Sequence, residues 1–207
     1  MIDSWPAGRR ISRAHPHLFG SAQLDERRDA DARFSTIRSA RTVIPVLYGG
    51  ENDEAAASET IFHTVDAAAG AHRPRRVALD KYRSWQWSEV VTTRQLALVR
   101  LEGAGLDALD VTRAELIDGG RGSYPQTRAW AQALAGALPN ADGLWWRSRQ
   151  APGRWAVMLF GRLRRRPGGV GPGDLTADSP TLPFATTAGL DRLDDIADGL
   201  DITVVRS

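Results

Sequence analysis

The chain has 207 residues, of which 42% are apolar and 25% charged, and its formal net charge is +2. These values are ordinary for one sizeable soluble domain with its own core, and the sequence has no run of about 18 apolar residues that would predict a membrane span. Cysteine is absent, which excludes disulfides, thiolate nucleophiles and cysteine metal sites.

The basic residues are unusual in kind. All but one of the 27 are arginine, and Lys81 is the only lysine. Arginine suits two-pronged recognition of phosphate and carboxylate groups. The near-balanced charge argues against nucleic acid as the main partner, because nucleic-acid-binding domains usually carry a strong basic excess. The first residues lack the apolar segment of a secretory signal, so we expect a cytoplasmic protein.

The first predicted strand lies in the N-terminal quarter of the chain. Residues 1–32 are polar and rich in arginine and aspartate, and we expect their beginning to be irregular. Residues 43–48, "VIPVLY", are short, apolar and β-branched, which predicts a buried strand. Gly49 and Gly50 are expected to end it.

A helix is expected directly after the two glycines. Asn52 or Asp53 would cap it, and Glu54 would lie in its first turn, where the helix dipole favours negative charge. The apolar and small residues that recur at helical spacing would form its buried face, namely Ser58, Ile61, Phe62, Val65 and Ala69.

The middle of the chain is predicted to contain three strands and a second helix. Pro125 suits the first turn of a helix that runs to about Ala137, with Trp130 and Leu134 pointing inward. The strands are expected within residues 75–82, 96–103 and 108–113.

Two adjacent strands are expected at 143–149 and 154–161, and Trp145 and Trp146 would point to opposite faces of the first. One ring would then be in the core and the other exposed or lining a pocket. Residues 164–183 are rich in arginine, glycine and proline and predict a loop. Residues 190–205 predict a short helix and a last strand. This mixture of strands with a few flanking helices predicts an α+β fold.

The common catalytic motifs are missing. The sequence has neither a phosphate-binding P-loop nor a G-x-S-x-G elbow, and "GGVGPGD" lacks the dinucleotide-binding pattern. Glu59 and His63 are four residues apart, as a metal pair on one helix face would be, but no third ligand is evident, so we expect no metal. The run Arg164–Arg166 is interpreted as a solvated loop edge, with phosphate contact as the alternative.

Four residues stand where predicted elements begin or end, namely Arg33, Tyr48, Glu59 and Ser148. Each has an ordinary structural explanation: a surface ion pair, the edge of a core, a solvated helix carboxylate and a strand hydroxyl. Together they support a further interpretation. An arginine followed by an aromatic residue, then "VLYGGENDEAAASETIFH", then "DGLWWRSR" before an apolar strand, resembles the RES domain family over about residues 30–160.

The resemblance implies a fold and an activity. The fold would be a compact single domain over residues 1–207, with an ADP-ribosyltransferase-like mixed or antiparallel β core flanked by helices. The activity would be consumption of NAD as substrate, without a metal. Arg33 and Tyr48 would bind NAD, while Glu59 and Ser148 would be catalytic.

The residues themselves suit this chemistry. Arginine offers a planar fork to the pyrophosphate, and a tyrosine ring can stack on the cationic nicotinamide. Cleavage of the nicotinamide–ribose bond builds positive charge on the ribose, which the Glu59 carboxylate would stabilise. Ser148 would hold the ribose or the carboxamide.

The resemblance also implies a partner. RES proteins are bacterial toxins paired with Xre-type antitoxins, so the chain is expected to deplete cellular NAD as a glycohydrolase or phosphorylase until an antitoxin neutralises it. Nucleic acid would be contacted only through the antitoxin, and no membrane is involved. The alternatives are transfer of ADP-ribose to a protein, and a nucleotide-binding module without catalysis.

Overall fold

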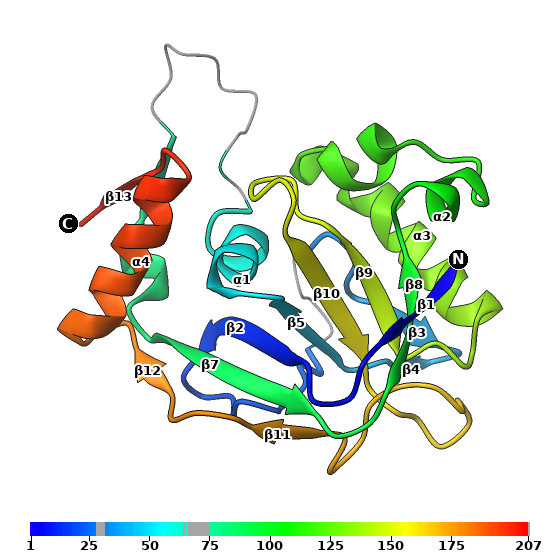
Figure 1. The fold of residues 1–207 in the computed structure, drawn as a ribbon. Coiled ribbons are helices and arrows are strands. Elements are labelled where there is room, and N and C mark those ends of the chain that lie inside the picture. Colours follow the sequence, from blue (N-terminus) through cyan, green and yellow to red (C-terminus); the bar gives the residue numbers. More distant parts are fainter. Residues whose placement is uncertain (28–31, 64, 66–74, 207) are drawn as a thin grey trace.

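Helices cover one face of a curved mixed sheet in the computed structural model, which describes residues 1–27, 32–63, 65 and 75–206 (Figure 1). No helix among the described residues is long and apolar enough to cross a membrane. The α+β architecture expected from the sequence is confirmed.

Nine strands of the described chain form the main sheet, in the spatial order β1–β8–β9–β10–β5–β2–β7–β11, with β12 also paired to β7. β8 and β9 run parallel, whereas the other neighbouring strands of this sheet run antiparallel. The strands are β1 (Ile2–Trp5), β2 (Arg10–Pro16), β5 (Val46–Gly50), β7 (Trp85–Thr92), β8 (Leu96–Arg100), β9 (Gly143–Arg147), β10 (Trp155–Phe160), β11 (Leu175–Ala177) and β12 (Leu182–Pro183). Two small ladders lie outside this sheet, β3 (Arg38–Ser39) with β4 (Thr42–Val43) and β6 (Arg76–Ala78) with β13 (Thr203–Val205).

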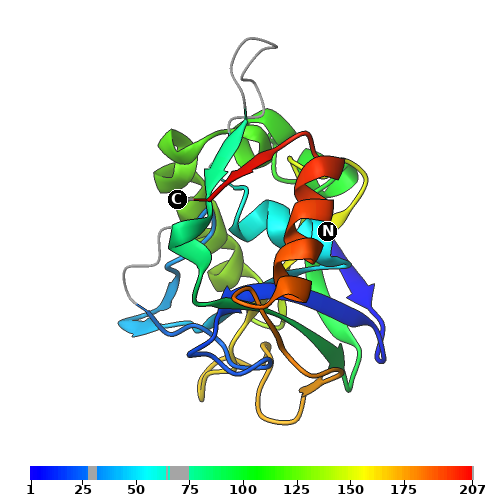
Figure 2. The same cartoon turned by 90° about the vertical axis from the view of Figure 1, so that its left-hand side faces the viewer.

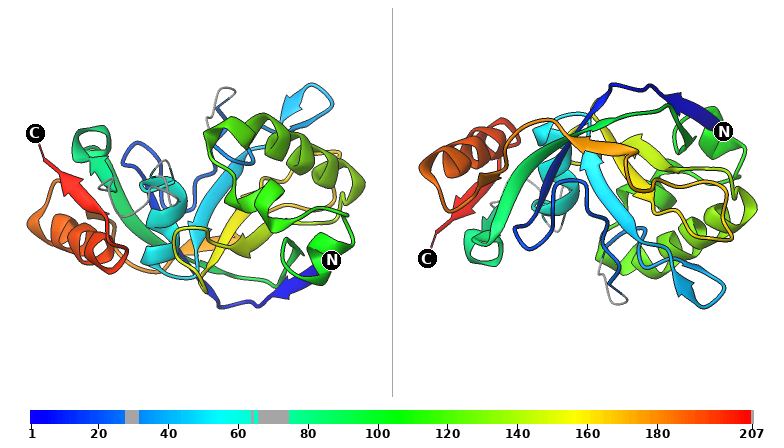
Figure 3. Two further views of the ribbon diagram at one scale, coloured as in Figure 1. Left: turned by 90° about the horizontal axis from the view of Figure 1, so that it is seen from above. Right: turned by 90° about the horizontal axis from the view of Figure 1, so that it is seen from below.

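The helices fall into three groups along the sheet. Seen from above, α4 lies at one end, α2 and α3 lie at the other, and α1 lies between them (Figure 3). The α-helices are α1 (Asp53–Thr60), α2 (Ala104–Asp107), α3 (Tyr124–Ala137) and α4 (Thr187–Gly199). Shorter turns are η1 (Leu79–Tyr82), η2 (Ala114–Asp118) and η3 (Arg121–Ser123).

The two glycines after the first predicted strand are part of that strand, contrary to expectation. β5 runs from Val46 to Gly50, and both glycines pair with β10. A Cβ atom on Gly49 would lie 2.4 Å from the Ile11 side chain, and one on Gly50 would lie 2.4 Å from the Ala55 side chain. Glycine is therefore needed for close approach of β5 to β2 and α1, not to break the strand.

α1 begins where predicted and ends sooner. The Asn52 side chain accepts a hydrogen bond from the Ala55 N–H at 3.0 Å, which caps the helix. The helix ends at Thr60, yet Ile61 and Phe62 beyond it are buried, as the spacing predicted. Ser58 and Val65 are buried as well, and Ala69 lies outside the described residues.

The N-terminal region is ordered from its second residue, so the irregular start was a wrong prediction. β1 pairs with β8, and β2 lies in the middle of the sheet. The sequence did not predict β2, because three of its buried residues are polar and interrupt the apolar pattern of a central strand. These residues are Ser12, Arg13 and His15. β7 also escaped notice, although "WQWSEVVT" is rich in strand-forming residues.

Residues 108–113 do not form the predicted strand. Thr112 and Glu115 instead form a reciprocal capping box at the start of η2: the Thr112 N–H donates to the Glu115 carboxylate at 2.8 Å, and the Glu115 N–H donates to the Thr112 hydroxyl at 3.3 Å. Asp110 has a φ of 50°, which turns the chain sharply. The motif T-x-x-E was the available signal for a helical turn.

The later elements agree better with the sequence. α3 spans Tyr124–Ala137, with Leu134 buried and Trp130 partly buried. β8, β9, β10, α4 and β13 all fall within the predicted ranges or extend them by a few residues. The expected loop at 164–183 contains two short strands, β11 and β12, because both add to the free edge of β7.

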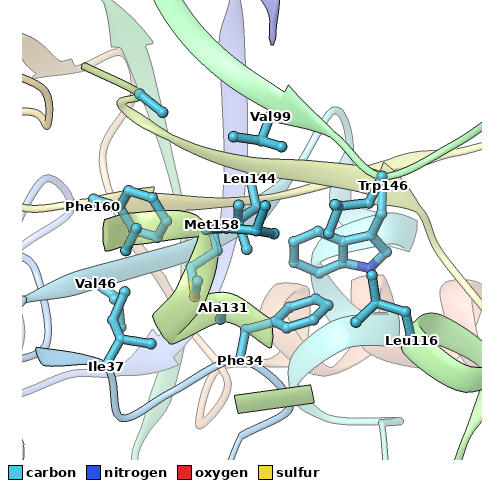
Figure 4. Packing of buried hydrophobic residues seen from close by; sticks show 14 of the residues in the cluster. Phe34, Ile37, Val46, Val99, Leu116, Ala131, Leu144, Trp146, Met158 and Phe160 are labelled. Atoms are coloured by element: carbon cyan, nitrogen blue, oxygen red, sulfur yellow. The ribbon is translucent and has the colours of Figure 1, made fainter. Parts of the chain in front are cut away.

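The sheet separates two sets of core residues, and the tryptophan pair shows how. Trp146 packs under the helices, in the cluster drawn in Figure 4. Trp145 points to the opposite face, where it stacks on Trp155 with ring centroids 4.3 Å apart. Both rings are buried, so the expectation that one is exposed or lines a pocket is wrong. The opposite face is covered by the segment that leads into β11, visible below the sheet in Figure 2.

On the helical face, the buried residues form two clusters rather than one. One lies under α2 and α3 and includes Phe34, Val46 and Trp146. The other lies between α1, η1 and α4 and includes Ala14 and Tyr82. Residues from both clusters line one pocket on the helical side, so that pocket lies where the clusters meet.

Candidate functional site

A pocket of about 360 Å³ opens where β2 and β5 part. Their described pairing is limited to Ser12 opposite Gly50, after which the two strands diverge. The far half of β2 and the first half of β5 then form opposing walls, and both contribute lining residues. The C-terminal end of α1, η1, the first residue of α3, the start of β7 and residues between β2 and β3 also contribute to the lining.

Arg33 lies in the loop that precedes β3 and projects into this pocket. Its side chain is 7% exposed, and its guanidinium makes no hydrogen bond or ion pair with a described residue. The loop is held by α3, because the Thr127 hydroxyl donates to the Arg33 carbonyl and the Arg128 Nε donates to the Ala32 carbonyl at 3.0 Å. Burial lowers the pKa of Arg33, and the nearby Glu59 carboxylate opposes that shift. The structure thus holds a desolvated cation ready for an anion.

Tyr48 faces the pocket from β5. Its hydroxyl accepts a hydrogen bond from the Phe34 N–H at 3.2 Å and is hydrogen-bonded to the Ser35 hydroxyl at 2.9 Å. Burial raises the pKa of this phenol, so it stays neutral. The ring itself is only partly buried and lines the pocket. Tyr48 therefore fastens the loop that carries Arg33 while it offers a ring face to a ligand.

Glu59 lies in the last turn of α1 and lines the same pocket. Its carboxylate makes no hydrogen bond or ion pair with a described residue, although most acidic side chains of α1 do: Asp53 pairs with Arg192 and Glu54 pairs with Arg154. The Glu59 charge helps to set the pKa of His63, whose imidazole pKa is lowered mainly by burial. A carboxylate without a protein partner in a pocket is free to contact a ligand.

Ser148 is placed differently from the other three predicted residues. It follows β9, is fully buried, and does not line this pocket. Its N–H donates to the Arg154 carbonyl at 2.9 Å, and its hydroxyl accepts from the Ala151 N–H at 3.4 Å. The next residue, Arg149, donates to the His63 carbonyl at 3.1 Å and so supports the chain beyond Glu59. The structure brings Arg33, Tyr48 and Glu59 together, and the catalytic role of Ser148 stays a prediction.

Tyr124 is a pocket residue that sequence reasoning missed. It is the first residue of α3, is 2% exposed, and its ring lies 5.4 Å from the Arg33 guanidinium carbon. Its hydroxyl has no hydrogen-bond partner among the described residues and is not sealed from solvent, so it faces the pocket. Burial raises the pKa of this phenol.

Two buried basic residues of β2 also line the pocket. The Arg13 guanidinium donates to the Gly20 carbonyl at 3.3 Å, and burial lowers its pKa to about 9. His15 Nε2 is 2.8 Å from the Ser88 hydroxyl, and burial together with the Arg13 charge lowers the His15 pKa to about 4. His15 is therefore a neutral wall residue near pH 7 and does not act as a general acid.

Metal ligands do not gather at this pocket. Within the described ranges, no three His, Asp or Glu side chains lie close enough together to hold an ion. His63 is engaged with the Thr60 carbonyl through Nδ1, which is the local bond expected for a helix-end histidine near the core.

Comparison with known proteins places this site in a family. Residues 9–183 match the RES domain, which spans a wider stretch than the motifs at 30–160. The chain belongs to the RES domain family.

The fold is shared with a solved structure, the crystal structure of the M. tuberculosis MbcT–MbcA toxin–antitoxin complex. The MbcT toxin of that complex matches with a TM-score of 0.60 at 14% sequence identity. The match covers 92% of this chain and 90% of that one. No curated protein sequence matches this chain significantly.

Proposed function

We propose that this protein is a toxin that cleaves the nicotinamide–ribose bond of NAD and so depletes the cellular pool. The observation that carries the proposal is that Glu59 and Arg33 line the same pocket. Neither side chain has a hydrogen-bond or ion-pair partner among the described residues. NAD brings what each of them lacks, because it has a cation next to the scissile bond and an anionic pyrophosphate.

The chemistry needs placement and one negative charge. The bond between the ribose anomeric carbon and the nicotinamide nitrogen breaks, its electron pair stays on nitrogen, and neutral nicotinamide leaves. The sugar becomes oxocarbenium-like, and the Glu59 carboxylate stabilises that charge. Water or phosphate then attacks the anomeric carbon, which gives ADP-ribose or its 1-phosphate.

The leaving group is accommodated by Tyr48. Its ring is exposed to the pocket, whereas its hydroxyl is tied to the loop, so the ring cannot swing away. A fixed aromatic face suits the flat, cationic nicotinamide ring. The pocket volume of about 360 Å³ lies within the roughly 300–1,000 Å³ typical of ligand sites.

The partner follows from the fold neighbour. That toxin was crystallised with its antitoxin, and we propose that this chain likewise has a cognate antitoxin, of the Xre type, that neutralises it in the cytoplasm. Contact with nucleic acid would occur only through that partner.

The test is product analysis with purified chain, free of antitoxin. NAD is incubated with and without inorganic phosphate, and the products are separated by liquid chromatography. Release of nicotinamide in equal amount to the NAD lost supports the proposal, and dependence on phosphate separates phosphorolysis from hydrolysis. If ADP-ribose appears instead on added bacterial protein, the chain is a transferase. If NAD survives unchanged while calorimetry shows binding, the chain is a binding module and the proposal is wrong.

A further inference from the structure

The proposed chemistry leaves part of the pocket lining unused. We call one unused group of lining residues the outer end, because it includes the exposed Lys81; its members are Phe19, Lys81, Tyr82 and Trp85. They are brought together by the end of β2. Pro16 pairs with Trp85, and the Gln86 side chain donates to the Phe19 carbonyl at 3.3 Å, so the turn after β2 lies against the beginning of β7.

The ring of Trp85 packs edge-to-face with the ring of Tyr82. The Tyr82 ring lies 5.0 Å from the Trp85 ring at an angle of 84°. Tyr82 is itself immobilised, because it is 8% exposed and its hydroxyl donates to the Ile61 carbonyl at 3.2 Å. Trp85 stays only partly buried and lines the pocket. The outer end thus presents a rigid, accessible indole.

Lys81 adds a positive charge to the lining of the same pocket. It is exposed, lines the pocket, and makes no ion pair or hydrogen bond with any residue in the described part of the chain. Apart from Arg33, the arginines of the pocket are already engaged: Arg27 donates to the Asp25 carboxylate through Nε and Nη2 at 2.6–3.0 Å, and Arg13 donates to backbone carbonyls. The only lysine of the chain therefore offers its charge to whatever enters the pocket.

We infer that this outer end is an adenosine subsite, in which the purine stacks on Trp85 and Lys81 pairs with the adjacent phosphate. The inference rests on the proposed use of NAD. A purine offers a π-face to an aromatic side chain, and an ammonium group pairs with phosphate without demanding one fixed geometry. Arg33 then contacts the pyrophosphate from the inner side and Lys81 from the outer side. The enzyme would select the whole dinucleotide over its nicotinamide half.

The experiment compares NAD with nicotinamide mononucleotide, which keeps the scissile bond and one phosphate but lacks the adenylate. We expect the wild-type chain to prefer NAD in kcat/KM. Trp85→Leu and Lys81→Ala should each lower kcat/KM for NAD by roughly ten- to hundredfold, because a stacked base or a phosphate contact is lost. Turnover of the mononucleotide should stay within about twofold.

The ratio of kcat/KM for NAD to kcat/KM for the mononucleotide is measured in one preparation. This ratio does not depend on the fraction of the protein that is folded. Trp130→Leu is the matched control, since Trp130 is partly buried on α3 and does not line the pocket. Equal losses on both substrates in the Trp85 and Lys81 variants, or no preference in the wild-type chain, would overturn the inference.

A binding measurement separates this inference from the proposed function. Calorimetric titration with ADP-ribose and with ribose 5-phosphate requires no turnover. We expect ADP-ribose to bind more tightly, and Trp85→Leu and Lys81→Ala to remove that advantage. If the wild-type chain cleaves neither substrate, the proposed activity fails while this titration still decides the subsite. If ADP-ribose binds both variants as well as the wild type, the subsite is wrong even in an active enzyme.

Discussion

Tyr48 and Ser35 are joined by a hydrogen bond of 2.9 Å between their hydroxyl oxygens, so the ring that lines the pocket also anchors the loop that carries Arg33. A second bond, from the Phe34 N–H to the same phenol at 3.2 Å, strengthens this connection. Two proposed substrate contacts are therefore coupled through one side chain.

Tyr48→Phe tests that coupling. The ring remains, but a buried N–H and a buried hydroxyl lose their partner, which typically costs about 1–3 kcal/mol of stability. We expect a lower midpoint in urea and a raised KM for NAD, because the Arg33 loop is no longer fastened. kcat should change less than KM. A variant with unchanged KM and unchanged urea midpoint would show that the phenol does not organise the loop.

Glu59→Gln should lower kcat by about 10²–10³, because the amide keeps the size of the side chain but loses the charge that stabilises the ribose cation. The circular dichroism spectrum should show unchanged folding, since the carboxylate has no partner in the described chain to lose. Glu54→Gln, on the same helix and outside the pocket, is the control and should retain full activity. A folded Glu59→Gln protein that still depletes NAD at the wild-type rate would refute the mechanism.

Arg33→Ala should weaken NAD binding by about 1.5–3 kcal/mol, as expected for a charged hydrogen bond to the pyrophosphate. The substitution also removes a buried cation without a partner, so we expect stability to hold or rise. Isothermal calorimetry gives the dissociation constant, and urea denaturation gives the stability. Arg165→Ala, at an exposed loop position, serves as the control. A lower stability together with unchanged affinity would mean that Arg33 is structural.

Acid should destabilise the fold through His15. Its pKa is about 4 when folded and about 6.5 in the unfolded chain, because burial and the Arg13 charge disfavour the protonated ring. The unfolded chain therefore binds more protons between these values, and stability falls as the pH drops from about 6.5 to about 4. The full effect of this one group is about 3 kcal/mol.

Urea denaturation at pH 7 and pH 4.5 measures that loss, and His15→Gln removes the titrating group while it keeps a polar side chain. The variant should lose less stability on acidification than the wild type. An identical loss in both proteins would assign the acid sensitivity to other groups.

The local signals that could be read from the sequence were those that depend on near neighbours. The Asn52 cap, the proline at the start of α3 and the apolar run of β10 all act within a few residues, and each element formed where expected. β2 could not be read, because Arg13 and His15 are buried by contacts that the chain makes only after folding. Gly49 was misread for the same reason, since its partner Ile11 lies 38 residues away and only the fold brings them together.

For the site, sequence motifs placed Arg33, Tyr48 and Glu59 in positions that share one pocket. They could not show that Ser148 is buried and does not line that pocket, since its burial depends on packing of the turn between β9 and β10. Tyr124 and Trp85 belong to no local pattern and enter the site through the folding of α3 and β7.

The parting of β2 from β5 also bears on when the protein becomes active during its synthesis. The pocket walls include Arg13 and Tyr124, and β5 is held in place by β10, which ends at Phe160. A chain still on the ribosome cannot form the whole pocket until Tyr124 and then β10, which supports Tyr48, have been made. β10 ends about three quarters of the way along the 207 residues. With synthesis at roughly 5–20 residues per second, the nascent polypeptide spends most of its production time without a working pocket. The proposed activity would therefore require synthesis to have passed β10, and the proposed antitoxin, if made earlier, could bind the pocket as soon as it forms.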